Sequence, residues 1–123
     1  RAAQETIAYQ VNDLLAAMAR DTGVPLTTLS VDGGASRDSF LMQFQADISD
    51  CTIRRPVIRE TTALGACYLA GLAAGVWKDR AELKQLWRCD TLYQPDMQAD
   101  TRARLLAGWD KAVGRSMDWA PHN

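Results

Sequence analysis

The sequence has 123 residues, of which 47% are hydrophobic and 24% are charged, and its formal net charge is −1. A chain of this size can fold as one globular domain that buries roughly two-thirds of its surface. Because basic and acidic residues alternate along the chain and nearly cancel, the sequence argues against binding to nucleic acid. No stretch approaches about 18 uninterrupted apolar residues, so we expect neither a membrane span nor a signal peptide.

The three cysteines, Cys51, Cys67 and Cys89, lie far apart, are odd in number and form no Cys-x-x-Cys pair. This pattern argues against a disulfide framework and against a zinc site, and it favours a reducing, cytoplasmic location. We expect Cys51 and Cys67 to act as small hydrophobic residues. His122 has no cysteine or carboxylate at ligand spacing, so no metal site is expected there.

A long helix is predicted at the start of the chain, because apolar residues recur there at helical spacing. These residues are Ile7, Val11, Leu14, Leu15 and Met18. The helix should end near Gly23, since glycine can take the left-handed position after a helix and Pro25 cannot continue one. The pattern starts directly at Arg1, with no initiator Met and no capping residue, so we expect the chain to be part of a longer protein.

A strand, a glycine turn and a helix are predicted next. Residues 26–31 are short and rich in Thr, Leu and Val, which favours a buried strand leading into a turn at Asp32-Gly33-Gly34. Ser36 can then act as the N-cap of the next helix. The apolar positions of that helix are Phe40, Leu41, Phe44 and Ile48.

The second half of the chain predicts one more strand, over residues 51–55, and three helices. Residues 60–77 predict a helix with a threonine cap, so rich in Ala and Gly that we expect it to be central, buried and close to another backbone. Asp79 should cap a short helix through Trp87, after which an irregular link crosses Pro95. The terminal amphipathic helix is marked by Leu105, Leu106, Trp109, Ala112, Val113 and Met117.

Together these patterns predict an α/β fold, rich in helix, with two short strands. Two strands do not make a stable sheet by themselves, so we expect their neighbours in a segment upstream of Arg1. The tryptophans are expected to be packing anchors. They are Trp77, Trp87, Trp109 and Trp119.

The glycine pair admits two interpretations. Asp-Gly is a common signal for a hairpin turn, but a hairpin needs a second strand, whereas the residues from Arg37 onward repeat with helical period. The alternative is a ligand site, because a backbone without Cβ atoms can lie flat against a ligand and the following helix presents free N–H groups at its N-terminus. Neither a Walker loop nor a Rossmann fingerprint is present, so the motif alone is a weak signal.

Longer blocks of sequence carry a resemblance. The blocks "SVDGGASRDSFLMQFQADI" (residues 30–48) and "ETTALGACYLAGLAAGVW" (residues 60–77) resemble the C-terminal part of the glycerol kinases, which are FGGY carbohydrate kinases. The block "AAQETIAYQVNDLLAAM" (residues 2–18) is similar to the helix that precedes that part. The resemblance runs over almost the whole chain and weakens after Trp87.

The resemblance implies a fold and an activity. The fold would be part of an actin- and hexokinase-like ATPase domain of the ribonuclease H-like type, with residues 1–123 forming the C-terminal portion of the ATP-binding domain, without the substrate domain. The activity would be the ATP-dependent phosphorylation of glycerol to glycerol 3-phosphate, with Mg²⁺. In that family the catalytic Asp, the glycerol-binding residues and the main phosphate loops lie upstream, so we expect no catalytic residue here and no turnover by this chain alone.

The resemblance also implies that Gly33, Gly34 and Ala35 close over the adenosine of ATP, with Asp38 beside the adenine. Glycerol kinases commonly have Asn at the position of Asp38. An amide can both accept from the adenine amino group and donate to a ring nitrogen, whereas an ionised Asp can only accept. We therefore expect adenine recognition to be altered or partly taken over by Ser39.

Other charged residues are expected to have structural roles. Asp47, Asp50 and Glu60 lie near helix ends, where capping or a place on the solvated surface is typical of carboxylates. The three arginines within residues 54–59 could meet a phosphate, but alternate residues at the end of a strand usually face solvent.

Two alternatives remain open. The chain could come from a sister FGGY kinase that acts on a pentose or hexose, which only the sugar-binding domain would distinguish. It could also be a regulatory module, because some bacterial glycerol kinases dock a phosphotransferase-system protein near the last helix. Residues 94–104 occupy that region here, with little specific likeness to the docking segment. The family further implies a homo-oligomer.

Overall fold

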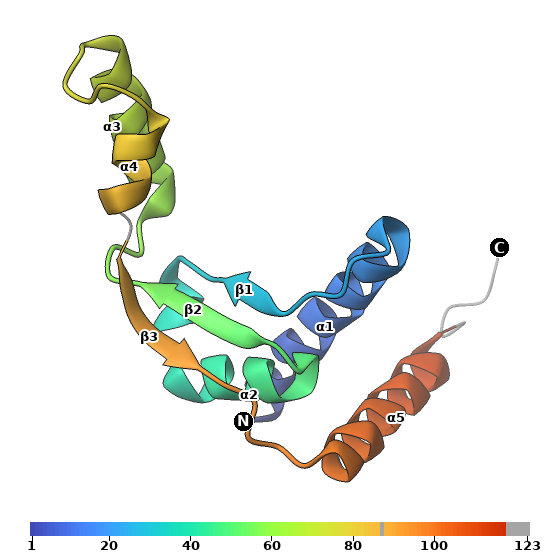
Figure 1. The fold of residues 1–123 in the computed structure, drawn as a ribbon. Helices are drawn as coiled ribbons and strands as arrows, with labels where there is room; N and C mark the ends of the chain where they lie inside the picture. Colours follow the sequence, from blue (N-terminus) through green and yellow to red (C-terminus); the bar gives the residue numbers. More distant parts are fainter. Residues whose placement is uncertain (87, 118–123) are drawn as a thin grey trace, which may run out of the picture.

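The computed structural model describes residues 1–86 and 88–117, and Figure 1 shows their α/β arrangement. The elements, in chain order, are α1 (Ala2–Thr22), β1 (Thr28–Ser30), the 3₁₀ turn η1 (Gly34–Arg37), α2 (Ser39–Ser49), β2 (Thr52–Pro56), α3 (Thr61–Ala73), α4 (Arg80–Leu86), β3 (Cys89–Tyr93) and α5 (Ala99–Ser116). Trp87, Trp119 and His122, for which the sequence made predictions, lie outside the described residues.

The strands form one sheet in the order β1-β2-β3. The β1 strand pairs in parallel with β2, placing Leu29 opposite Ile53, and β3 pairs antiparallel with β2, placing Tyr93 opposite Ile53. The prediction of two strands is therefore wrong. The second neighbour of β2 comes from downstream residues 89–93, because Thr91, Leu92 and Tyr93 suit a strand. The expectation of further neighbours upstream of Arg1 stays a prediction.

Helices α1 and α2 cover one face of the sheet, and the core lies between them and β2 (Figure 1). Ile53 in the centre of β2 is fully buried, and the Tyr9 ring meets the Phe44 ring edge-on at 5.6 Å between centroids. The β1 strand was predicted to be buried, which is wrong, because it forms an edge of the described sheet and two of its three residues are exposed.

Two helix ends differ in how well the sequence predicted them. Helix α1 ends at Gly23, as predicted, with a left-handed φ of 67° and its N–H donating to the Ala19 carbonyl. The cap of α2 is Asp38 and not Ser36, because Asp38 directly precedes the first helical residue in an extended conformation. Its Oδ1 accepts from the backbone N–H groups of Phe40 at 3.0 Å and Leu41 at 3.1 Å.

Helices α3 and α4 lie side by side and project from one end of the sheet (Figure 1). The prediction that the Ala- and Gly-rich helix is central and buried is wrong, since Leu69 is 71% exposed and Cys67 is exposed as well. The physical reason is that, among the described elements, only α4 and the segment before it cover α3. The small residues do allow one close contact, because a Cβ added to Gly71 would lie 2.0 Å from Cζ3 of Trp77.

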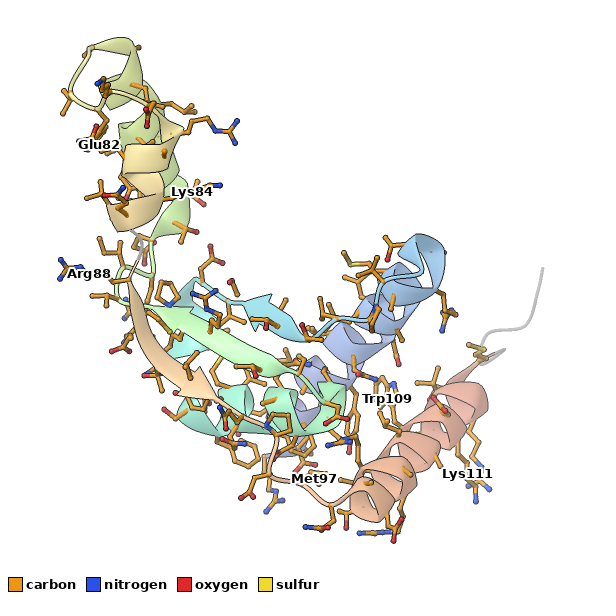
Figure 2. All side chains as sticks on the ribbon, viewed as in Figure 1. Glu82, Lys84, Arg88, Met97, Trp109 and Lys111 are labelled. Atoms are coloured by element: carbon orange, nitrogen blue, oxygen red, sulfur yellow. The ribbon has the colours of Figure 1, made fainter. Side chains whose placement is uncertain are left out.

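Helix α5 returns to the start of the chain. Trp109 stacks on Tyr9 at 5.2 Å between ring centroids, and its Nε1 donates to Asp13 at 2.7 Å. Figure 2 shows Trp109 on the side of α5 that faces α1, with Lys111 on the other side. The predicted packing role of Trp109 is confirmed. Within the described part of the chain, no helix is long and apolar enough to cross a membrane.

Candidate functional site

The glycine loop (residues 32–38) connects β1 to α2. Gly33 has φ 76° and ψ −174°, a conformation that is essentially restricted to glycine. A Cβ added at Gly33 or Gly34 would meet no atom within 4 Å, so the loop backbone is open on one side. The hairpin interpretation is excluded, because β1 pairs in parallel with β2 and is followed by a helix. The loop has the open backbone that a ligand site needs.

The closed side of the loop is fixed by hydrogen bonds. The Ser36 hydroxyl is buried and donates to the Gly33 carbonyl at 2.7 Å, which closes the 3₁₀ turn on itself. The Gly33 N–H donates to the carbonyl of Arg59 at 3.0 Å, and Nη1 of Arg55 donates to the carbonyl of Ser36 at 3.3 Å. The loop is thus attached to β2 and to the residues that follow it.

Arg55 does not face solvent, contrary to the prediction for the basic run. Its side chain is only 11% exposed, because it lies on the same face of β2 as the buried Ile53. The guanidinium pairs with the Asp90 carboxylate, with 3.1 Å between Nη2 and Oδ2, and lies 5.4 Å from the centre of the Tyr93 ring. Arg59 also pairs with Asp90, at 3.5 Å. Period-two alternation from Ile53 was the signal in the sequence for this burial.

Asp90 accepts hydrogen bonds from several donors. The hydroxyl of Thr91 donates to Oδ2 at 3.2 Å, and Arg55 and Arg59 donate to the same oxygen. The Thr91 hydrogen bond, together with the two guanidinium groups, lowers the pKa of Asp90 below its usual value, which outweighs the opposing effect of partial burial. Asp90 is therefore charged at neutral pH and holds both arginines.

Asp38 is occupied by contacts within the protein. Besides capping α2 through Oδ1, its Oδ2 accepts a hydrogen bond from Nε2 of Gln4 in α1. The predicted substitute, Ser39, accepts a hydrogen bond from the Tyr93 hydroxyl at 3.1 Å. Oδ1 already accepts two hydrogen bonds and Oδ2 accepts one, so the second lone pair of Oδ2 can still accept from one more donor.

A hollow of about 250 Å³ lies beside the loop, between α1, β1 and α2. Ala35 and Asp32 line it from the loop, and Ile7, Val11 and Leu29 are among the other lining residues. This volume is below the roughly 300–1,000 Å³ of typical ligand pockets, and the mainly apolar lining suits a flat ring better than a phosphate. Of the four residues predicted for the site, only Ala35 lines this hollow.

The other carboxylates that the sequence analysis considered have structural contacts. Oδ1 of Asp47 accepts from the backbone N–H of Asp96 at 2.8 Å, and Asp50 pairs with Arg102 at 2.8 Å. Glu60 lies 3.9 Å from Arg37. Among residues 1–86 and 88–117, no group of three or more His, Cys, Asp or Glu side chains could hold a metal ion. Asp47, Asp50 and Glu60 are thus all engaged in contacts within the protein.

The sequence of the loop and its surroundings matches a known family. Residues 1–74, more than half of the chain, match the model of the C-terminal domain of the FGGY family of carbohydrate kinases. The chain belongs to this family. The match includes α1, β1, the glycine loop, α2, β2 and α3, which are the elements that place the candidate site.

Individual relatives extend the similarity along the chain. The chain is 52% identical over its full length to a glycerol kinase of Alkaliphilus oremlandii and 55% identical over 92% of its length to one of Bacillus anthracis. It covers 24% and 23% of those two proteins. The chain thus spans about a quarter of the length of these relatives.

Solved structures show the same fold. The crystal structure of Plasmodium falciparum glycerol kinase with ADP is 33% identical, with a TM-score of 0.82, and the match covers 95% of this chain and 24% of that one. A ligand-bound xylulose kinase from Lactobacillus acidophilus, 24% identical with a TM-score of 0.81, covers 97% and 24% and shows the fold alone. The prediction of a partial ribonuclease H-like ATPase domain is confirmed.

Proposed function

We propose that this chain is the C-terminal portion of the ATP-binding domain of a glycerol kinase, an enzyme that transfers a phosphoryl group from ATP to glycerol. The observation that carries the proposal is the identity of 52% to 55% with glycerol kinases over nearly the whole chain. The structures of a xylulose kinase and a gluconate kinase share the fold at only 24% and 25% identity. A kinase of the same family that acts on a pentose or hexose is therefore the less favoured alternative.

Within this enzyme we propose that Gly33, Gly34 and Ala35 form the wall against which the adenosine lies. Two features support this role: the backbone is open at both glycines, and Ala35 lines the apolar hollow beside them. The structural relative from Plasmodium falciparum was solved with ADP, which supports nucleotide use. Asp38, at the N-terminus of α2, would accept a hydrogen bond from the adenine amino group with its remaining lone pair.

The contribution of this chain to the reaction is to bind and orient the nucleotide. Mg²⁺, when bound, would neutralise the charge that develops on the transferred phosphoryl group. Among the described residues no group of three or more His, Cys, Asp or Glu side chains lies together, so this part of the chain has no metal site built from protein side chains alone. The glycerol site and the base that accepts the hydroxyl proton would lie in the other part of the protein. The homo-oligomer, the phosphotransferase-system partner and the cytoplasmic location stay predictions.

Two measurements test the proposal. In an isotope-labelled sample of the chain, ATP should shift the backbone amide signals of Gly33, Gly34, Ala35 and Asp38 and leave those of α4 unchanged. A well-dispersed spectrum without any shift would show that this wall does not bind adenosine by itself. For the full-length protein, ATP-dependent phosphorylation should be faster with glycerol than with xylulose or gluconate. A preference for either sugar substrate would contradict the assignment as a glycerol kinase.

A further inference from the structure

The glycine loop is held by two arginines that belong to one segment. The carbonyl of Arg59 accepts from the Gly33 N–H, and the side chain of Arg55 donates to the Ser36 carbonyl. These contacts lie at the two ends of the turn that the nucleotide would touch. A shift of this segment would therefore move the open face of the loop.

The guanidinium of Arg55 uses all three of its nitrogen atoms. Nη1 donates to the Ser36 carbonyl at 3.3 Å, Nε donates to Asp90 at 3.2 Å, and Nη2 donates to the Thr91 hydroxyl at 2.9 Å. Such a planar fork cannot be reproduced by lysine, whose ammonium is a single point of charge. The geometry fixes the Ser36 carbonyl relative to β3.

Burying this arginine is costly in free energy, which argues that its charge has a purpose. A charge taken out of water is disfavoured unless it is paired, and well-packed hydrophobic residues often stabilise a fold at least as well as a buried ion pair. Arg55 faces the core side of the sheet, where an apolar side chain would fit the pattern set by Ile53. The arginine provides what an apolar residue could not, which is a directed donor to the loop.

Asp90 connects the two arginines. Its Oδ2 accepts from Arg55 and, at 3.5 Å, from Nη2 of Arg59. One carboxylate on β3 therefore restrains both residues that hold the loop, although it lies 35 positions from Arg55 and 31 positions from Arg59 in the sequence.

We propose that Arg55 and Asp90 are positioning residues for nucleotide binding, because they set the conformation of the glycine loop without touching the nucleotide. This inference rests on the proposed function, since it takes the open face of the loop as the adenosine wall. It adds residues of β2 and β3 to a site that the sequence assigned to the loop alone.

The test uses the full-length protein with Arg55→Lys, Asp90→Asn and the milder Thr91→Val, which keeps the shape of the side chain. The control is Arg115→Lys, at an exposed position in the last turn of α5. Losing one charged hydrogen bond should raise the KM for ATP roughly tenfold in the first two variants and less in Thr91→Val. The KM for glycerol should stay unchanged, and the control should behave as the parent protein.

Amide hydrogen exchange provides a second readout that needs no nucleotide. The Gly33 and Asp38 amides should exchange faster in Arg55→Lys and Asp90→Asn, while those in the middle of α1 should not change. Unchanged exchange in the loop, or an unchanged KM for ATP in variants that fold, would overturn the positioning role. So would equal changes in both KM values, which indicate general damage. If the parent protein used no ATP, the proposed function itself would fail, whatever the loop exchange shows.

Discussion

Replacing Gly33 by alanine should destabilise the fold, whereas the same change at the neighbouring Gly34 should not. Gly33 has φ 76° and ψ −174°, and an alanine held there costs on the order of 1–3 kcal/mol. The space around an added Cβ is empty of other residues, so the cost comes from strain between that Cβ and the adjoining backbone at this φ and ψ. Relaxing to an ordinary φ would not help, because it would break the hydrogen bonds that Gly33 makes with Arg59 and Ser36.

Gly34 is the matched control. It has no positive φ, and an added Cβ meets no atom within 4 Å, so alanine should be neutral or stabilise the chain by about 0.4–1 kcal/mol through the unfolded state. Urea unfolding of the chain, followed by tryptophan fluorescence, measures both changes. Equal stability of Gly33→Ala and Gly34→Ala would refute the reasoning. In the full-length protein, Gly34→Ala should still weaken ATP binding, because its methyl group enters the space proposed for the nucleotide.

Three further predictions concern other parts of the molecule. Gly71→Ala should destabilise the fold by about 1–3 kcal/mol, because its methyl group would overlap the Trp77 ring, and an unchanged thermal midpoint would contradict this contact. Cys51 should be the slowest of the three thiols to react with iodoacetamide, since burial, with a smaller effect of Asp50, raises its pKa. Peptide mass spectrometry measures the order of labelling, and faster labelling of Cys51 than of Cys67 or Cys89 would contradict this prediction. Asp90 contributes stability that is present above its unfolded pKa of 3.8 and is lost as the pH falls through its lower folded pKa. Asp90→Asn should therefore make the free energy of unfolding less dependent on pH in acid, and identical pH profiles would count against the ion pairs.

Some elements could be predicted because residues close together in the sequence determine them. The end of α1 at Gly23 and the helix after the glycine loop both follow from residues within a few positions of each other. The cap of α2 was harder, because Ser36 and Asp38 are both good caps and only the start of the helix decides between them. The third strand was missed because Pro95, shortly after it, favoured an irregular link.

Burial and the contacts between strands were harder to predict from the sequence. Composition shows that α3 is apolar, but it does not show which element covers the helix. The predicted burial of α3 was therefore wrong, and Leu69 is exposed. The link between Arg55 and Asp90 could not be predicted, because it depends on the register between β2 and β3. The resemblance of residues 30–48 identified the loop, while the residues that hold it became visible only in three dimensions.

The attachment of α5 has a consequence for motion. No residue of this helix is buried, and its main anchors are the stack of Trp109 on Tyr9 and the contacts of Arg102 with the end of α2. A helix with so little buried surface can separate from the rest at a lower free energy than global unfolding requires. The last helix should therefore open and close as a unit while the sheet and the glycine loop stay folded.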